Sequence, residues 1–486
     1  MMRKLAFYGF TGLLLLSAVT SQVKRDPRAV ALAGAYSTIA DGIFTVGYNP
    51  ALLAYQVDKP FMLQLAGFDI GIMGNYFSLA ALNSLSGDTL NQSDKDALLN
   101  RLDNAGGLKF FSDYHMAFPG LNYASGNMAL TSNMLIMADY KFPADLIRLI
   151  LEGNADNPVL DLTFQYEIMG VNEFGFSFAV PYQKLAFGLT LKYLQGMFYL
   201  GVDQDSSSSE FVTTPTSVYG SGTYQLRQGI GGTGIALDIG ISSQEINGWR
   251  FGFSIINALG SISWNKPSMI KDILAGPDNQ YGNGDDLFHF TWGGETLNDS
   301  NKVVYTFIID SLRADNLSSG APFRSSSKVV NNLDKNGKPK QFKTNYPAIL
   351  RFGTSLRKND LLLSSDLITG FEDRLFARAG WKWSIGAELT RFEGMPLRIG
   401  FAWAGLDNTE LGMGFGIHKG PMIFDVGFAF RNGIWFQTMK GFNLSLGFTI
   451  TSFKSRKEKL PGGPAPELET GTEQILKEEV ESPAQE

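Results

Sequence analysis

Hydrophobic and polar residues alternate with a period of two along many short segments of this chain. Between Trp249 and Ile255, aromatic and aliphatic residues occupy every second position, with Arg250, Gly252 and Ser254 between them. Only an extended strand places alternate residues on opposite faces. The same alternation occurs at 174–180, 185–193, 235–241, 350–352, 383–389, 397–403, 411–417, 422–430 and 442–450. A tilted strand crosses a bilayer with about nine to eleven residues, and most of these segments are of that length or slightly shorter. The pattern predicts an all-β protein.

The residues on the second face of these strands decide between a soluble β-protein and a membrane barrel. A soluble sandwich has a strongly charged outer face, whereas this second face carries Gly, Ala, Ser and Thr with isolated charges. The isolated charges, which we expect to face a narrow lumen, are Arg351, Arg357, Glu388, Arg398 and Asp425. A bilayer accepts only helices or closed sheets. The sequence therefore predicts a transmembrane antiparallel β-barrel, with a secreted sandwich or propeller as the alternative.

The first 21 residues have the layout of an export signal. Arg3 and Lys4 precede an apolar run that ends at Val19, and the small Ser21 follows. This order is typical of a cleaved signal peptide, and an uncleaved anchor is the alternative. No later window has the roughly 18 uninterrupted apolar residues of a membrane-spanning helix. We therefore expect residues 1–21 to be removed and the barrel to be integral to the outer membrane of a Gram-negative-type bacterium.

The C-terminal end combines one more strand with a polar tail. Segment 442–450 is similar to the terminal strand by which the barrel-assembly machinery recognises outer-membrane barrels, and we assign this role to Phe448, Ile450 and Phe453. Phe453 falls on the opposite parity from the other two. Residues 454–486 contain five basic and eight acidic residues after a Pro- and Gly-rich start. This composition predicts a disordered, acidic periplasmic tail, either an inert linker or a partner-binding segment.

Two helical signals interrupt the strand pattern at about residues 83–160. The first has Ser93 as its expected N-cap and places leucines from Leu98 to Leu102 on one face. The second begins at Pro143 and stops at Gly153. We expect this small helical insertion to cap one mouth of the barrel or to extend a plug. Polar stretches at 201–228, 265–300 and 311–346 are expected to be loops.

Composition excludes most kinds of catalytic and metal site. The chain has no Cys, three His and a net charge of -6, which argues against thiolate chemistry and a broadly basic nucleic-acid-binding surface. GIGGTG at 229–234 matches the dinucleotide-binding pattern by letters, but a strand follows it where phosphate binding requires a helix. We expect no enzyme activity, cofactor or metal. The alternative is an outer-membrane lipid hydrolase whose triad is dispersed along the chain.

Residues 27–55 carry the most distinctive motif. An Ala- and Gly-rich stretch precedes Asp41-Gly42, and Asn49-Pro50-Ala51 follows. Here the chain resembles the FadL/TodX family of outer-membrane hydrocarbon transporters and the related PorV-like proteins. Four later segments follow the order of that family's final strands, namely ILRFGTSLR, LLLSSDL, SIGAELTRFEGMPLRIGFAWAG and LGMGFGIHKGPMIFDVGFAF. The helical insertion departs from the fatty-acid transporters and resembles uncharacterised members of the superfamily.

The resemblance implies a barrel of about fourteen strands over residues 61–453, a length that suits roughly 12 to 16 strands. It also implies that residues 22–60 fold inside the barrel as a plug. The residues that would form or gate the plug are Gly34, Asp41, Asn49, Pro50 and Ala51.

The implied function is passive transport of hydrophobic small molecules of the fatty-acid or hydrocarbon class. The alternative is a PorV-like barrel that anchors secretion or surface-assembly partners and does not transport. Expected partners are outer-membrane lipid, an apolar small molecule, the barrel-assembly machinery and secretion or periplasmic proteins.

Overall fold

The computed structural model describes residues 26–56, 61–76, 91–153, 158–203, 206–264, 301–313, 322–331, 342–404 and 409–452, with short pieces at 78, 80, 291–292, 295–296, 333 and 335–338. The predicted signal peptide, the predicted tail and Phe453 lie outside these residues. Within them, no helix is long and apolar enough to cross a membrane.

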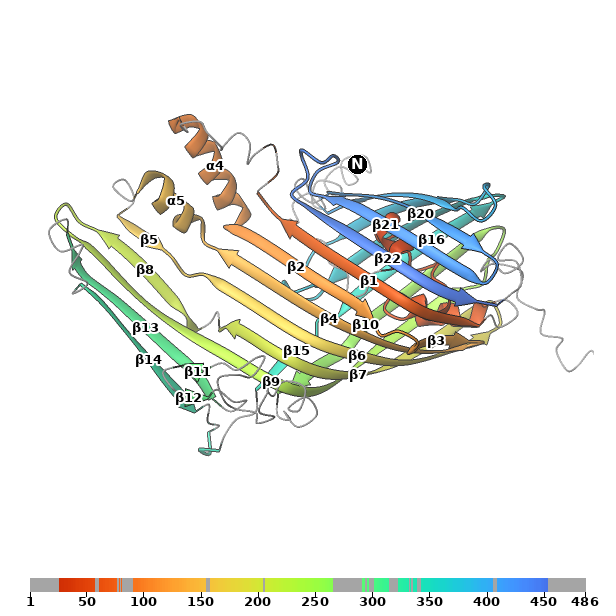
Figure 1. The fold of residues 1–486 in the computed structure, drawn as a ribbon, viewed down its shortest axis with the longest axis horizontal. Helices are drawn as coiled ribbons and strands as arrows, with labels where there is room; N and C mark the ends of the chain where they lie inside the picture. The colour runs from red at the N-terminus through yellow and green to blue at the C-terminus, as the bar shows by residue number, and fades with distance from the viewer. Residues whose placement is uncertain are drawn as a thin grey trace, which may run out of the picture.

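Fourteen antiparallel strands form a closed barrel, on the right in Figure 1. They are β1 (Met62–Gly74), β2 (Leu108–Ala117), β4 (Met128–Phe142), β6 (Gln165–Tyr182), β7 (Leu185–Val202), β9 (Val218–Ser243), β10 (Trp249–Ser263), β16 (Ile349–Lys358), β17 (Leu361–Gly370), β18 (Lys382–Leu389), β19 (Leu397–Trp403), β20 (Thr409–Lys419), β21 (Met422–Arg431) and β22 (Gly441–Thr451). The last strand closes on the first, with Ile450 opposite Leu63. The prediction of a barrel of about fourteen strands is confirmed.

The outer surface of the barrel is apolar, and its inner surface carries small and polar residues. On β6, Phe174, Phe176 and Phe178 are exposed, whereas Ser177 between them is fully buried. This is the reverse of a soluble protein and matches a surface that faces hydrocarbon. Phe448 and Ile450 belong to this outward face of β22, where Phe448 pairs with Ala66 of β1. Their role in assembly stays a prediction.

The two ends of the barrel differ in the length of their connections. Turns as short as Gly420-Pro421 join strands at the end where β1 begins, whereas the connection from β1 to β2 at the other end spans residues 75–107. In outer-membrane barrels the short turns face the periplasm and the long connections face outward. We therefore name these the inner end and the outer end.

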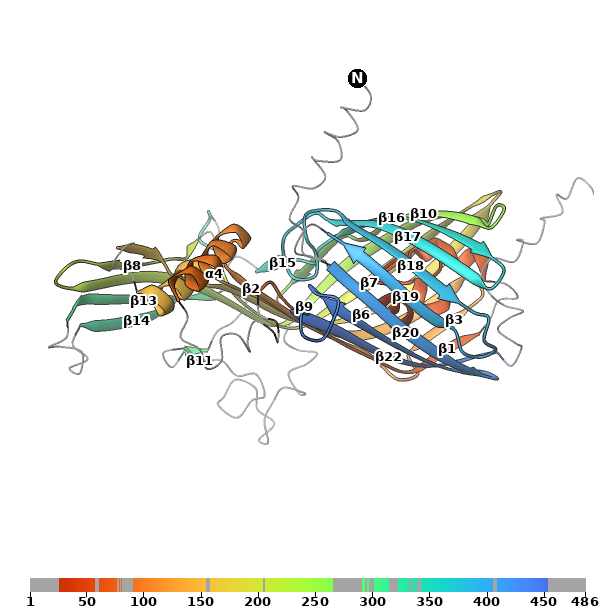
Figure 2. The ribbon, with the colours of Figure 1, turned by 90° about the horizontal axis from the view of Figure 1, so that it is seen from above.

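At the outer end the wall continues as an extension sheet, on the left in Figures 1 and 2. It consists of β5 (Val159–Asp161), β8 (Ser208–Thr213), β13 (Asn301–Leu312), β14 (Phe323–Asn331) and the first residues of β9, and β9 pairs with β8 on one side and β13 on the other. The expectation of loops at 201–228 and 311–346 is therefore wrong in large part, because both stretches contain extension strands. These strands are polar because they lie beyond the part of the wall with an apolar outer face. Most of 265–300 is outside the described residues.

The two predicted helices are present at the outer end. α4 (Gln92–Ala105) begins two residues earlier than expected, because Asn91 and not Ser93 is the N-cap, and its side chain accepts a hydrogen bond from the Asp94 nitrogen at 3.0 Å. α5 (Ala144–Glu152) follows Pro143 and ends at Gly153 as predicted. The insertion at 83–160 is not wholly helical, however, because β2, β3 (Asn122–Ser125) and β4 separate the helices. α4 and α5 pack on each other through Leu98, Leu99 and Leu102.

Residues 26–56 lie inside the barrel at its inner end, as Figure 2 shows. They form α2 (Pro27–Ala31) and two short 3-10 helices, η1 (Gly42–Thr45) and η2 (Pro50–Tyr55). Nearly all their side chains are buried. We refer to residues 26–56 as the plug.

Candidate functional site: a plugged lumen with a cavity at its mouth

Glycines on the inner wall allow the plug backbone to lie directly against the strands. A Cβ atom on Gly188 of β7 would lie 2.2 Å from the Ala51 nitrogen, and one on Gly400 of β19 would lie 2.2 Å from the Leu32 carbonyl carbon. Both distances are far below van der Waals contact. Further glycines that a Cβ would bring within 3.0 Å of plug atoms are Gly240, Gly252, Gly353, Gly386, Gly412, Gly414 and Gly427. The small residues of the inner face thus shape the lumen to the plug.

Asn49, Pro50 and Ala51 lie in the plug, where the resemblance placed them. The Asn49 side chain accepts a hydrogen bond from the Ala51 nitrogen at 3.1 Å and donates one to the Ile241 carbonyl oxygen of β9 at 3.1 Å. Pro50 occupies the first turn of η2, where its missing N–H costs nothing. The Asn-Pro-Ala motif is therefore both a helix start and an attachment to the wall, and its role in gating stays a prediction.

A buried chain of charges connects the plug to β18, β19 and β21. Nε of Arg28 lies 3.2 Å from Oε2 of Glu388, and Nη1 of Arg28 lies 3.1 Å from Oδ1 of Asp41. Arg398 continues the chain, at 2.5 Å from Glu388 and 2.7 Å from Asp425. Four of the residues singled out in the sequence thus meet in one network. Arg28 was missed, because it ends the charged run that begins at Lys24 and is not distinguished from a solvated charge by sequence alone.

Two further predicted residues, Gly34 and Arg357, have separate positions. Gly34 follows α2 with a φ of 91°, a left-handed conformation that favours glycine, and its nitrogen donates to the Ala29 carbonyl oxygen at 2.8 Å. Arg357 lies at the inner end, where its Nε is 3.6 Å from Oε2 of Glu245. It does not join the Arg28 network.

The first residue of the plug carries an unusual carboxyl group. Burial raises the pKa of Asp26 to about 6, against the opposing attraction of Arg28. Oδ1 of Asp26 accepts a hydrogen bond from the Arg28 nitrogen at 2.8 Å, so Asp26 is also the N-cap of α2.

A second group of buried charges lies farther along the lumen, between the plug and the outer end. Nζ of Lys192 lies 3.0 Å from Oδ2 of Asp238 and 3.4 Å from Oε2 of Glu173. Nζ of Lys382 lies 2.8 Å from Oε2 of Glu410. The middle of the lumen therefore contains paired charges.

Large apolar side chains from the outer connections fill the lumen beyond these charges. Trp264, Phe342, Tyr346 and Phe376 join inward-facing wall residues in one buried cluster. The rings of Phe342 and Tyr199 are 5.0 Å apart, and those of Tyr346 and Phe376 are 5.3 Å apart. We name Trp264, Phe342, Tyr346 and Phe376 the outer stopper. The lumen is thus occupied from both ends.

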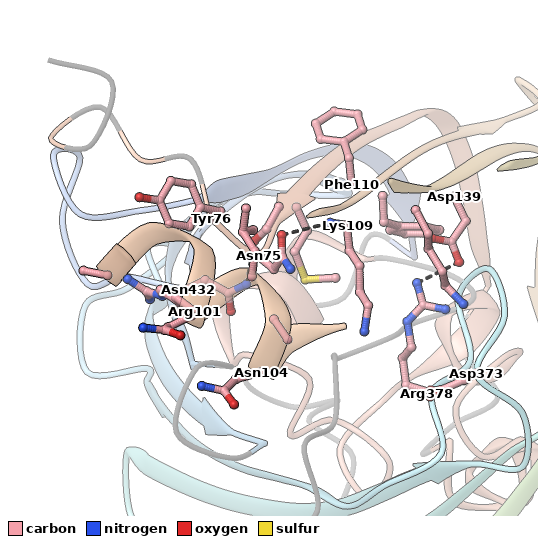
Figure 3. Close-up of a pocket in the computed structure, with 18 residues that line it drawn as sticks. Asn75, Tyr76, Arg101, Asn104, Lys109, Phe110, Asp139, Asp373, Arg378 and Asn432 are labelled. Carbon is pink, nitrogen blue, oxygen red and sulfur yellow. Dashed lines mark hydrogen bonds and ion pairs between the residues drawn. The ribbon is translucent and has the colours of Figure 1, made fainter. Parts of the chain in front are cut away.

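A cavity of about 510 Å³ lies beside the outer stopper, under the last turns of α4 (Figure 3). Its apolar lining residues are Met73, Tyr76, Leu102, Phe110 and Phe111. Its cationic lining residues are Arg101, Lys109, Lys141 and Arg378, against the carboxylates Asp139 and Asp373. Sequence reasoning predicted the helix but not this cavity, because α4, β2, β4 and the connection after β17 meet only in the folded chain.

The cationic side of the cavity is built from neighbouring strands. Lys109 of β2 and Lys141 of β4 are direct cross-strand partners, an arrangement of like charges that destabilises a sheet. Nη2 of Arg378 donates to Oδ2 of Asp139 at 2.9 Å, and Figure 3 shows Lys109 and Arg378 extending toward the same part of the cavity. We name this cavity the mouth cavity. Its lining can hold a molecule with a large apolar part and a polar or anionic end.

This fold and site define an integral β-barrel of the outer-membrane type that holds its own N-terminal segment in the lumen. The chain belongs to DUF5723, a family of unknown function whose model matches residues 50–324. A comparison with curated proteins found no match.

Solved structures similar to this chain are barrels of the FadL/TodX type. The toluene transporter TbuX of Ralstonia pickettii is 13% identical with a TM-score of 0.47, covering 88% of this chain and 98% of its own. A Pseudomonas aeruginosa FadL homologue is 10% identical with a TM-score of 0.43, covering 90% and 99%. The toluene transporter TodX of Pseudomonas putida is 9% identical with a TM-score of 0.42, covering 89% and 98%. The resemblance to PorV-like proteins stays a prediction.

Proposed function

We propose that this protein is an outer-membrane channel for hydrophobic small molecules, which bind first in the mouth cavity and pass through the lumen when the plug moves. The observation that carries the proposal is the cavity itself, because its volume of about 510 Å³ lies in the range of small-molecule sites and its wall combines aromatic rings with a few charges. Met73, Phe111 and Leu102 are its buried apolar surfaces.

The proposed path runs from the mouth cavity past the outer stopper, through the charged middle of the lumen, to the plug. Phe111 lines the cavity and also belongs to the cluster that contains the outer stopper, so the cavity and the lumen share a wall. Both the stopper and the plug must move for passage. A channel closed in this way excludes ions and water while it is empty, which suits a carrier of apolar molecules.

The test locks the plug to the wall. A Cβ on Gly386 would lie 3.0 Å from the Leu32 Cβ, slightly less than the roughly 3.5–4.5 Å of a disulfide, and replacing Leu32 removes the rest of its side chain. The chain has no Cys, so the double variant L32C/G386C forms one defined bond. Uptake of labelled toluene and of labelled oleate into proteoliposomes is measured before and after reduction, with L32C alone as control.

Uptake that is low in the oxidised double variant and returns on reduction supports transport through a moving plug. Equal uptake in both states overturns the role of the plug. Uptake no faster than in protein-free vesicles, for the wild type and the reduced variant alike, overturns transport itself.

The filled lumen and the extension sheet favour a second function, that of a barrel that anchors secretion or surface-assembly partners. The extension carries exposed apolar side chains, including Tyr219, Ile308 and Phe323, and exposed apolar patches mark protein-binding surfaces. Wild-type protein that takes up neither probe and loses surface assembly when β13 and β14 are replaced by a short turn would support this second function.

A further inference from the structure

Arg351 of β16 points into the lumen and is 1% exposed. None of its Nε, Nη1 and Nη2 atoms has a hydrogen-bond partner in the part of the chain that the structure describes. Its guanidinium carbon lies 4.9 Å from the centre of the Tyr48 ring in the plug. The ring covers one face of the guanidinium group and leaves its edge, with all five N–H donors, without an acceptor.

The carboxylates near Arg351 bond to other groups, and Oδ1 of Asp366 has no hydrogen-bond partner among the described residues. Oδ2 of Asp366 accepts hydrogen bonds from the plug nitrogens of Tyr36 at 3.1 Å and Ser37 at 2.9 Å. Asp238 is bound to Lys192 at 3.0 Å, and its Oδ1 accepts from the Asn257 nitrogen at 2.8 Å. Neither carboxylate forms a hydrogen bond to Arg351. The wall carboxylates therefore attract Arg351 at a distance without accepting a hydrogen bond from it.

Burying a guanidinium group without hydrogen-bond acceptors costs roughly several kcal/mol of folding free energy, unless an anion or water accepts its hydrogen bonds. The planar fork of an arginine matches the two oxygens of a carboxylate or phosphate group. Arg351 also lies between the plug and the cluster of the outer stopper. Tyr48 of the plug contacts it on one side, and its cross-strand partner is Ile368, which belongs to the cluster of the outer stopper.

We propose that Arg351 is the centre of an oxyanion-binding site inside the lumen, between the plug and the outer stopper. The ligand is a carboxylate or phosphate group held by the guanidinium edge. Its source is either a free inorganic anion or the polar end of an amphiphilic molecule. Only the second source rests on the proposed transport function, because a free anion needs no passage of an apolar molecule.

The experiment measures binding at equilibrium and does not depend on uptake. Purified full-length barrel in a neutral detergent is titrated with inorganic phosphate, octanoate or octanol at constant ionic strength, and thermal unfolding and calorimetry give the dissociation constants. The variants are Arg351→Met, which removes the charge, and Arg351→Lys, which keeps the charge without the fork. Arg357→Met is the matched control, because Arg357 pairs with Glu245 at the inner end.

We expect saturable binding of phosphate, octanoate or both to the wild type and to Arg357→Met. Affinity should fall about 10-fold to 100-fold in Arg351→Lys, the value of a charge-assisted bidentate pair, and binding should vanish in Arg351→Met. Phosphate binding identifies a free anion, and binding of octanoate alone identifies an amphiphile. The proposal is overturned if neither anion binds, if Arg351→Met binds as the wild type does, or if octanol binds as well as octanoate. Should Arg351→Met fail to fold, Arg351→Lys decides.

Discussion

Arg28 in the plug and Glu388 in β18 form a buried ion pair with Nε 3.2 Å from Oε2, although 360 residues separate them in the chain. Glu388 also binds Arg398, so one carboxylate holds a plug cation and a wall cation together. Because Glu388 is buried, its loss leaves Arg28 paired with Asp41 alone and Arg398 paired with Asp425 alone. One attachment of the plug to the wall is therefore a buried, shared ion pair.

Glu388→Gln should loosen the plug. Removing one partner of a buried ion pair costs about 3–5 kcal/mol, because the remaining charges stay desolvated. A cysteine at the buried Ser37 of the plug is the reporter, in a chain that has no other Cys. We expect maleimide labelling of this cysteine to accelerate about 100-fold or more. Glu245→Gln, which removes the partly exposed partner of Arg357, should leave the rate unchanged, and equal rates in both variants would contradict the prediction.

Gly400→Ala should displace α2. The added Cβ would lie 2.2 Å from the Leu32 carbonyl carbon, a backbone atom that cannot rotate away, so the plug must shift or the strand must bend. The same cysteine reporter at Ser37 should become accessible, and the melting temperature should fall. Gly220→Ala is the control, because its Cβ would meet only side-chain atoms among its nearest neighbours, Ile309 Cδ1 at 3.2 Å and Phe211 Cδ2 at 3.3 Å. A Gly400→Ala variant that behaves like this control would show that the glycine contacts do not hold the plug.

Ala105→Trp should slow uptake without unfolding the protein. Ala105 lines the mouth cavity from the last turn of α4, and an indole there fills much of the space that a ligand would occupy. Ser93→Trp places the same side chain on an exposed position of α4 away from the cavity. We expect initial uptake of toluene and oleate to fall several-fold only for Ala105→Trp. A similar decrease in both variants, or no decrease in either, would show that the mouth cavity is not on the transport path.

Docking of the plug should weaken as the pH rises from about 4 to about 7. Asp26 faces Arg28, Tyr36 and Asp425, and burial raises its pKa to about 6 from 3.8. A raised pKa means that the docked plug favours the protonated carboxyl group. The free energy that Asp26 adds to docking is therefore complete below about pH 4 and is lost as the pH rises past 6. The difference amounts to about 3 kcal/mol.

Hydrogen exchange of residues 26–34 tests this pH dependence, with Asp26→Asn measured beside the wild type at each pH so that intrinsic exchange rates cancel. Asn keeps the N-cap acceptor of α2. Protection in the wild type should decline relative to Asp26→Asn as the pH rises. A ratio that is constant between pH 4 and pH 7 would exclude Asp26 as the titrating group.

The barrel was predictable because its outward face has a strict period. β19 (Leu397–Trp403) has the bounds that alternation predicted, and Leu397, Ile399 and Phe401 are exposed as a lipid-facing strand requires. The extension sheet was not predictable in the same way. Val218 to Leu226 of β9 mix Gly, Ser and Thr with scattered aromatics, because neither face there meets a uniform environment.

The site was predictable only in part, for a related reason. Inward positions of Glu388, Arg398 and Asp425 follow from strand parity, but their meeting with Arg28 depends on which strands are neighbours and on where the plug enters. The mouth cavity and the unpaired N–H donors of Arg351 depend on side-chain positions in three dimensions. Periodicity assigns a residue to a face, and contacts between distant segments decide what it does there.

The position of α2 has a consequence for how the chain is completed. α2 begins the described part of the chain, yet it packs against β19, β20, β21 and β22, the last strands to be synthesised. Until those strands exist, the segment near the N-terminus has no surface on which to settle. The position of α2 thus depends on the last four strands of the barrel, since a chain cut short before β19 would retain most of its wall but would have no surface for this helix.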